Sequence, residues 1–381
     1  RMSNELKRGL EGVLVAESKL SHVDGEAGRL VYRGHDIEAL ARGATYEEVL
    51  YLLWHGALPT RAELDSFADA LAAERAVDEN VLATVRRLAD ADEEPMAALR
   101  TAVSMLSAYD DTAADATDGD VLAEGARITA KIPTILAAFD RARRGASPLE
   151  PDPSHSHAGD FLRMLTGTAP DDVREETFDM ALTLHADHGL NASTFTALVI
   201  GSTMADVYAA VTGGIGALSG SLHGGANQDV MEMLYEVDES GKDPTEWVQA
   251  ATDEGRRIPG FGHRVYEVKD PRAQILSEKL DDLAAASGDD RWLRYTAAIE
   301  SYLTDEGLTD QGIAPNVDFY SGSVYETMGI PMDLYTPIFA MSRVGGWVAH
   351  VNEYRADNRL IRPRARYTGP ESAEFVPIDE R

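Results

Sequence analysis

Three residues combine reactive side chains with a flexible local sequence: His223, His263 and Asp318. His223 lies in the segment SGSLHGGAN (219–227), His263 in PGFGHRVY (259–266) and Asp318 in PNVDFYSG (315–322). Each segment contains Gly or Pro, so we expect all three side chains on loops, where a rigid scaffold commonly holds catalytic groups. Imidazole and carboxylate groups exchange protons near neutral pH, and the set therefore predicts acid–base catalysis.

The residues around His223 and Asp318 predict different protonation states for the two groups. An amphipathic pattern over Gln228 to Val237 predicts a helix with Asn227 as its N-cap. The positive end of that helix would disfavour imidazolium and keep His223 neutral, able to donate a hydrogen bond. Apolar and aromatic neighbours would raise the pKa of Asp318 and make it a better base. On local sequence alone, a bystander histidine in a glycine-rich turn and an aspartate that caps the next helix remain as alternatives.

Other histidines give a weaker signal. His185 and His188 lie three positions apart in a helical pattern and could bind a metal ion. Cys is absent and no third ligand is near in the sequence, so we expect no metal and no cofactor. A metal hydrolase built on this pair is one alternative, which full activity in EDTA would exclude. His155 and His157 lie in a proline-rich polar loop (145–159), where we expect them to be solvent-exposed.

Three arginines indicate the class of substrate. Arg272 follows Asp-Pro, Arg343 begins the segment RVGGW, and Arg362 begins RPR. A guanidinium group binds a carboxylate through two parallel hydrogen bonds, so several arginines in one pocket would suit a small polycarboxylate. The alternative is that each arginine pairs with one of the many Asp and Glu residues.

The charge balance excludes several kinds of partner. The 381 residues include 65 acidic and 35 basic side chains, a formal net charge of −30. Nucleic acids and anionic membranes would be repelled by such a surface. The longest apolar stretch, 194–218, contains Asp206 with several Gly and Ser, so we expect a buried helix there and not a membrane span. No signal peptide and no cysteines are found, and a cytoplasmic location is expected.

Helical periodicity dominates the chain, which predicts a mainly α fold. Short strands or extended turns are expected only between 10 and 34, around Gly25 and Gly28. Pro133 lies inside a long helical pattern over 121–144 and predicts a kink or break. At this length, two domains are expected more than one.

Seven sequence blocks give the chain a specific likeness to a known family. They are LHADHGLNAST (184–194), SLHGGAN (221–227), PGFGHRVY (259–266), DPR (270–272), NVDFYSG (316–322), SRVGGWVAH (342–350) and RPR (362–364). In content and order these blocks resemble citrate synthase, and the resemblance runs through most of the chain. In length the chain is similar to the short, dimeric type of archaea, in particular halophilic ones.

The resemblance implies a multi-helical, two-domain citrate synthase-like fold that forms a homodimer. A large helical domain would consist of residues 1–224 and 333–381, the last part including an arm to the partner subunit. A small helical domain, 225–332, would be inserted into it, with the active-site cleft between the two.

The resemblance also implies a role for each candidate residue. Asp318 would remove a proton from the methyl group of acetyl-CoA, neutral His223 would stabilise the enol, and His263 would polarise and protonate the oxaloacetate carbonyl. Hydrolysis of citryl-CoA would then give citrate and CoA. The oxaloacetate carboxylates would be held by His188, Arg272, Arg343 and, from the partner subunit, Arg362. CoA would lie against the backbone of Arg257, Ile258, Pro259, Gly260 and Phe261.

Two readings compete with this one. A 2-methylcitrate synthase would use propionyl-CoA on the same scaffold. A pocket discriminates between two acyl groups that differ by one carbon by only about 1–3 kcal/mol. A non-catalytic helical interaction protein would lose nothing but stability when His223 or Asp318 is replaced. Turnover of the two acyl-CoA substrates tests the first reading, and these substitutions test the second.

The high net charge predicts that the protein works in concentrated salt. Self-repulsion among acidic side chains opposes the compact state, and salt screens it. We therefore expect the melting temperature to rise as KCl is added, measured by thermal unfolding across a salt series. A melting temperature that stays flat or falls with added KCl would contradict this expectation.

Overall fold

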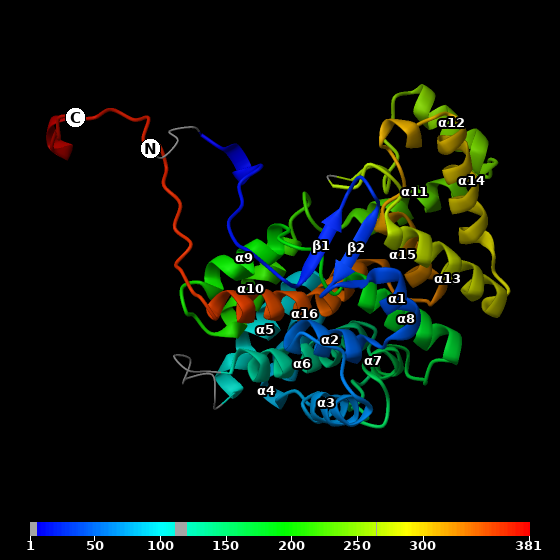
Figure 1. Ribbon diagram of the computed structural model, residues 1–381, viewed down its shortest axis with the longest axis horizontal. Helices are drawn as coiled ribbons and strands as arrows, with labels where there is room; N and C mark the ends of the chain where they lie inside the picture. Colours follow the sequence, from blue (N-terminus) through cyan, green and yellow to red (C-terminus); the bar gives the residue numbers. More distant parts are fainter. Residues whose placement is uncertain (1–5, 111–119, 264) are drawn as a thin grey trace.

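Helices build most of the computed structural model, which describes residues 6–110, 120–263 and 265–381 (Figure 1). The mainly α prediction is therefore confirmed. The first part of the chain forms α1 Ile37–Gly43, α2 Tyr46–His55, α3 Arg61–Ala73, α4 Glu79–Asp90, α5 Pro95–Leu106, α6 Val121–Arg143, α7 His157–Thr166, α8 Asp172–His185, α9 Ala192–Gly201 and α10 Val207–Leu218. The rest forms α11 Ala226–Ser240, α12 Pro244–Asp253, α13 Pro271–Ser287, α14 Arg291–Asp305, α15 Val317–Thr327 and α16 Tyr335–Arg355.

Local capping explains where several helices begin. Thr45 and Glu48 form a capping box at the start of α2: the Thr45 hydroxyl accepts the Glu48 N–H, and the Glu48 carboxylate accepts the Thr45 N–H at 2.8 Å. The same reciprocal pair, Thr60 and Glu63, starts α3. Gly56 ends α2 at φ 88°, a conformation that favours glycine.

A small antiparallel sheet is the β structure of the described residues. Strands β1 Ser21–Asp24 and β2 Arg29–Tyr32 form a hairpin in which Ser21 pairs with Tyr32 and Asp24 with Arg29, and β3 His35–Asp36 adds to β2. The prediction of short strands around Gly25 and Gly28 is confirmed. The predicted extended segment from residue 10 to 18 contains no strand, and Arg8–Leu10 forms one turn of 3₁₀ helix.

Helix α16 occupies the centre of the body (Figure 1). Nearly every position from Tyr335 to Val351 is buried, because α2, α6, α8, α9 and α10 contact it on different sides. Glycines allow these close approaches: a Cβ atom on Gly345 would lie 2.3 Å from Leu50, and one on Gly346 would lie 2.4 Å from the Ala186 carbonyl oxygen. Because it is enclosed on all sides, α16 lacks the exposed polar face of a surface helix over this stretch.

Two predictions concern long helices. Of the kink or break predicted at Pro133, the break is absent, since α6 continues through the proline with buried residues on both sides of it. The packing of α6 outweighs the cost of about 3 kcal/mol that a proline inside a helix imposes. The apolar stretch 194–218, predicted as one helix, divides into α9 and α10, because Met204 adopts φ 66° and Asp206 caps α10. In the described part of the chain, no helix is both long and apolar enough to cross a membrane.

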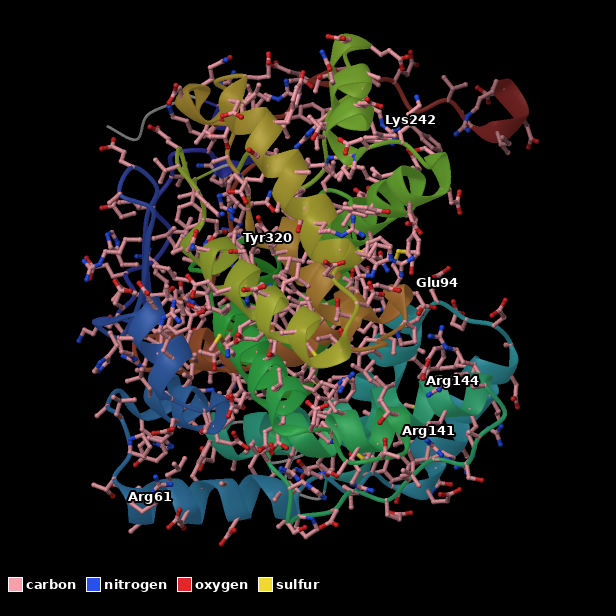
Figure 2. All side chains as sticks on the ribbon, turned by 90° about the vertical axis from the view of Figure 1, so that its right-hand side faces the viewer. Arg61, Glu94, Arg141, Arg144, Lys242 and Tyr320 are labelled. Atoms are coloured by element: carbon pink, nitrogen blue, oxygen red, sulfur yellow. The ribbon has the colours of Figure 1, made fainter. Side chains whose placement is uncertain are left out.

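Charged side chains project from all sides of the body (Figure 2). Arg61 on α3, Glu94 before α5 and Lys242 after α11 lie far apart on this surface. Helices α11, α12, α14 and α15 gather at one end of the molecule, with α13 beside them (Figure 1). The division into domains at residues 225 and 332 stays a prediction.

Replacing Gly346 by alanine tests the packing between α16 and the 186–189 turn. Alanine favours helix by up to about 1 kcal/mol over glycine, but the added Cβ atom would overlap the Ala186 carbonyl and the Asp187 carboxylate. We expect Gly346→Ala to lower the free energy of unfolding by about 1–3 kcal/mol, measured by urea unfolding in salt. Gly43→Ala is the matched control, because Gly43 is helical and has no atom within 4 Å of an added Cβ. Equal stability of the two variants would contradict the predicted overlap.

Candidate active site

A cavity of about 1290 Å³ brings most of the predicted site residues together. Its walls come from the turn after α8, the loop before α11, the loop before α13, the first turn of α15 and the middle of α16. The predicted residues that line it are His188, His223, Arg257, His263, Arg272, Asp318 and Arg343.

A short backbone bridge places the His263 and Asp318 segments side by side. Phe261 and Pro315 form an isolated antiparallel bridge, with the Gly262 N–H donating to Ala314 O and the Asn316 N–H donating to Gly260 O, both at 2.9 Å. Gly260 adopts φ 81°, and a Cβ atom there would lie 2.8 Å from Phe319. The 260–262 segment therefore packs directly against the start of α15, which leaves no room for a side chain at Gly260.

Backbone contacts fix the protonation state of His263. Its Nδ1 accepts hydrogen bonds from the N–H groups of Val265 and Tyr266, at 3.0 and 3.1 Å. A nitrogen that accepts two N–H groups carries no proton, so Nε2 is the protonated nitrogen and can donate. Burial, and secondarily the charge of Arg272, lowers the pKa of His263 to about 4. The ring is therefore a neutral hydrogen-bond donor at physiological pH.

His223 is fixed in the opposite tautomer. Its Nε2 lies 3.1 Å from the Ser193 N–H, which donates to it, and 2.8 Å from the Ser193 hydroxyl. The proton of a neutral ring must then be on Nδ1. His223 lies directly ahead of α11, as predicted, but the N-cap prediction is wrong: Gly225, at φ 92°, occupies the N-cap, and Asn227 is buried inside the helix.

Asp318 lies in the first turn of α15 and not in a loop as expected. Asn316 is the N-cap, since its side-chain oxygen accepts the Asp318 N–H at 2.9 Å, so the alternative of a capping aspartate is wrong. Burial is the main cause that raises the pKa of Asp318, to about 6, while the charge of Arg272 opposes the shift. The direction agrees with the prediction made from its apolar neighbours.

Two of the predicted arginines are buried beside the cavity. Arg272 pairs with Asp270 through two hydrogen bonds of 3.0 and 2.7 Å, as the alternative of an acidic partner expected. Arg343 has a different environment: its Nε donates to the His185 carbonyl at 2.6 Å, and its guanidinium lies 4.6 Å from the centre of the Phe339 ring. Burial lowers the pKa of Arg343 to about 10, so it stays charged. The cavity is thus locally positive within an acidic protein.

Arg362 is placed differently from the other arginines. It is exposed, in an extended segment that leaves the body after α16, and it does not line this chain's cavity (Figure 1). Of the predicted CoA segment, Arg257 lies on the cavity wall, while Ile258 and Phe261 are buried beneath it.

His188 contacts the His263 loop within the cavity. Its Nε2 lies 3.2 Å from the Tyr266 hydroxyl, and its ring centre lies 5.5 Å from that of His263. Burial, assisted by the charges of Arg272 and Arg343, lowers the pKa of His188 well below its usual value. His188 is therefore neutral, and it can exchange hydrogen bonds with an anionic ligand.

The structure does not support a metal site built on His185 and His188. It also does not support the predicted solvent exposure of His157. Helix α8 ends at His185, so His185 and His188 do not share a helix face, and His185 bonds to its own helix at Ala181 O. Among the described residues, no group of three or more His, Cys, Asp or Glu could hold a metal ion. His157 is buried at the start of α7 against Tyr46, because Ser156 caps the helix earlier than predicted.

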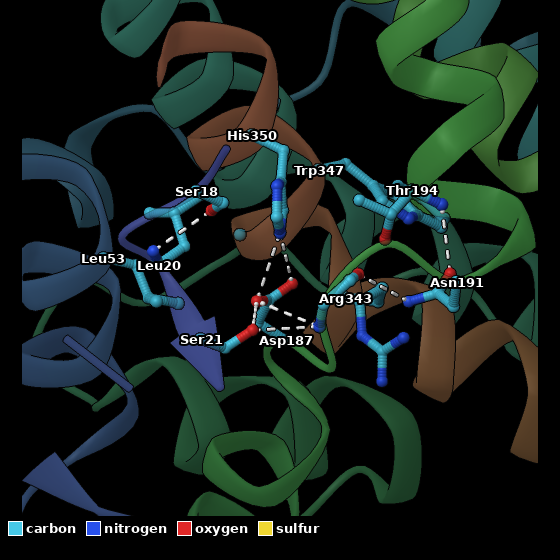
Figure 3. Close-up of polar contacts among 12 residues, drawn as sticks. Ser18, Leu20, Ser21, Leu53, Asp187, Asn191, Thr194, Arg343, Trp347 and His350 are labelled. Carbon is cyan, nitrogen blue, oxygen red and sulfur yellow. Dashed lines mark hydrogen bonds and ion pairs between the residues drawn. The ribbon is translucent and has the colours of Figure 1, made fainter. Parts of the chain in front are cut away.

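Local sequence reasoning missed the residues that support the cavity from behind. Asp187 is fully buried, accepts a hydrogen bond from Ser21 at 2.5 Å and lies 3.2 Å from His350 Nε2 (Figure 3). Ser193 and Trp347 support His223 in the same way, with the Trp347 Nε1–H donating to the Ser193 hydroxyl at 3.2 Å. Ser21 and Asp187 are 166 positions apart and Ser193 and Trp347 are 154 apart, so no local pattern could have paired them.

Known proteins match the chain along nearly its whole length. The family model "Citrate synthase, C-terminal domain" matches residues 9–364. The citrate synthase of Haloferax volcanii is 64% identical over 100% of both chains. A 2-methylcitrate synthase of Corynebacterium glutamicum is more distant, at 38% identity over 100% of this chain and 99% of that protein.

Solved structures agree with this relationship. Citrate synthase from Pyrobaculum aerophilum superposes with a TM-score of 0.92 at 41% identity, covering 98% of this chain and 95% of that chain. The enzyme from Thermoplasma acidophilum, solved as a ternary complex with carboxymethyl coenzyme A and oxaloacetate, gives a TM-score of 0.89 at 32% identity over 100% of both chains. In sequence, in fold and in the composition of its cavity, the chain belongs to the citrate synthase family.

Proposed function

We propose that this cavity condenses acetyl-CoA with oxaloacetate and water to give citrate and CoA, with His223, His263 and Asp318 as the catalytic residues. The observation that supports this most is the pairing of two neutral histidines of fixed tautomer with a carboxylate of raised pKa in one positive cavity. Enolisation of a thioester needs a base and a hydrogen-bond donor at its oxygen, and the set supplies both.

Oxaloacetate binds at the positive wall of the cavity. Arg272 and Arg343 take its two carboxylates, and His188 adds a hydrogen bond. Asp270 already neutralises part of Arg272, which keeps that side chain in place before the substrate arrives. Arg362 of a second copy completes the set, so the working form is a homodimer with shared sites. Its exposed, extended segment supports this arrangement.

Asp318 begins the reaction by removing a proton from the acetyl methyl group. His223 donates its Nδ1 proton in a hydrogen bond to the thioester oxygen and stabilises the enol. The enol carbon then attacks the oxaloacetate carbonyl carbon, and His263 supplies the Nε2 proton to the oxygen that becomes the citrate hydroxyl. Water hydrolyses the resulting citryl thioester, releasing the CoA thiol.

The CoA moiety lies along the Arg257–Phe261 segment at the cavity wall. Closure of the unit 225–332 over the rest of the chain would exclude water before enolisation. No step needs a metal or another cofactor, because the base and both donors are side chains. A cytoplasmic location stays a proposal of ours, and propionyl-CoA is the alternative acyl donor.

Replacing Asp318 by asparagine tests the base. The amide keeps the shape but cannot accept the methyl proton, so we expect kcat to fall by about 10²–10⁴-fold. Release of the CoA thiol from acetyl-CoA is measured with and without oxaloacetate, in molar KCl with EDTA. Asp305→Asn, at the exposed end of α14, is the matched control and should keep full activity.

Three results would contradict parts of this proposal. Activity of Asp318→Asn within a few fold of wild type would exclude Asp318 as the base. Loss of wild-type activity in EDTA would indicate a metal. Faster turnover of propionyl-CoA than of acetyl-CoA would make 2-methylcitrate the product.

The raised pKa of Asp318 predicts a pH dependence for both activity and stability. We expect kcat/KM to rise with pH and to level off above about 6, where Asp318 is ionised and His263 is already neutral. A folded-state pKa above the unfolded value of 3.8 means that this group contributes stability in its protonated form, which is lost as pH rises through about 6. Asp318→Asn should therefore melt higher than wild type at pH 8, with a smaller difference at pH 4. A lower melting temperature at pH 8 would contradict the assigned shift.

A further inference from the structure

The β1–β2 hairpin contacts two loops of the cavity from behind, one at each of its ends. At its base, the Ser21 hydroxyl donates to the Asp187 carboxylate at 2.5 Å and accepts the Gly189 N–H at 2.9 Å. These two partners flank His188 in the sequence. Across the hairpin, the Tyr32 hydroxyl donates to Asp187 O at 2.8 Å and accepts the Asp187 N–H at 3.2 Å. The base of the hairpin therefore holds the turn that carries His188.

This turn is itself fixed to α16. The Asp187 carboxylate is fully buried, and both of its oxygens lie 3.2 Å from His350 Nε2 (Figure 3). A Cβ atom on Gly346 would lie 2.6 Å from Asp187 Oδ1, so the carboxylate fills the space that this glycine leaves. The hairpin base is anchored to the central helix of the protein.

The tip of the hairpin is seated on the other loop. The Gly25 carbonyl accepts the Glu267 N–H at 3.0 Å, and a Cβ atom on Gly25 would lie 1.8 Å from the Val265 carbonyl oxygen. A Cβ atom on Gly28 would lie 2.6 Å from the Val268 side chain. Residues 265–268 lie just after His263 in the chain, and Val265 and Tyr266 supply the two N–H groups that hold its Nδ1. The tip of the hairpin therefore contacts the segment whose N–H groups orient the His263 ring.

Between the two ends, the loops meet at the cavity wall, where the Tyr266 ring contacts those of His188 and His263. We propose that the β1–β2 hairpin is a clamp that sets the separation of His188 and His263, with Ser21 and Gly25 as its positioning residues. The proposal rests on the oxaloacetate-binding roles given above to the two histidines. Two groups that act on one small ligand must be spaced accurately, since a misplacement of 1 Å can lower the rate about 10²-fold.

Single and double substitutions at the two ends test the clamp. Ser21→Ala removes one hydroxyl, and Gly25→Ala adds one methyl group at a backbone conformation that alanine tolerates. We expect each to raise the Kd of oxaloacetate, measured by calorimetry without acetyl-CoA, and to lower kcat/KM for oxaloacetate, both by about tenfold. The KM of acetyl-CoA should stay unchanged. Because both ends serve one spacing, the double variant should lose little more than the worse single variant. Gly43→Ala is the control, expected to match wild type.

Each other result overturns the clamp. Oxaloacetate affinity within twofold of wild type in either single variant would show that the hairpin end does not position the site. Losses that multiply in the double variant would show two independent contacts. A lower melting temperature with unchanged Kd and kcat would make the hairpin a purely structural element.

A further variant, His263→Gln, separates this proposal from the assigned roles. If it keeps full activity, the role of His263 fails, whatever the hairpin variants do. If it loses activity while Ser21→Ala and Gly25→Ala do not, the clamp alone fails.

Discussion

The site depends on a backbone pairing of only a few residues, between 260–262 and 314–316. Two hydrogen bonds of 2.9 Å and one bridge bring the His263 loop and the start of α15 together, and no side chain can intervene at Gly260. Main-chain pairing is well suited to this purpose, because it fixes position without using the side chains that must face the substrate. The pairing brings His263, whose tautomer its own loop fixes, close to Asp318 at the start of α15.

Burial sets the protonation states of the groups in the cavity, and the desolvation of charged side chains is its main free-energy cost. Desolvation keeps His188 and His263 neutral and raises the pKa of Asp318, whereas the buried arginines retain their charge. Charged groups can be buried only with partners, and Asp270 and the His185 carbonyl supply them. An acidic protein with net charge −30 thus holds a local positive site for an anionic substrate.

Sequence reasoning succeeded where the signal was local or where a motif covered the function. Short strands are predicted around Gly25 and Gly28, and the motif blocks name the histidines, arginines and aspartate that line the cavity. It failed where tertiary contacts decide. Pro133 does not break α6, because packing holds the helix together, and His157 is buried because α7 begins at His157 with Ser156 as its N-cap. Asp187 carries no local sign that it bonds to Ser21, because the interaction joins segments 166 positions apart.

The position of α16 in the chain has a consequence for how the protein is made. This helix is the centre of the core, yet the helices that pack around it all precede it in the chain. Trp54, for example, donates to Gly345 O across 291 positions. During translation the apolar faces of the earlier helices therefore stay uncovered. These helices complete a stable core only when residue 351 has emerged from the ribosome. Folding of such non-local contacts is slow, and the nascent chain is open to aggregation during this interval.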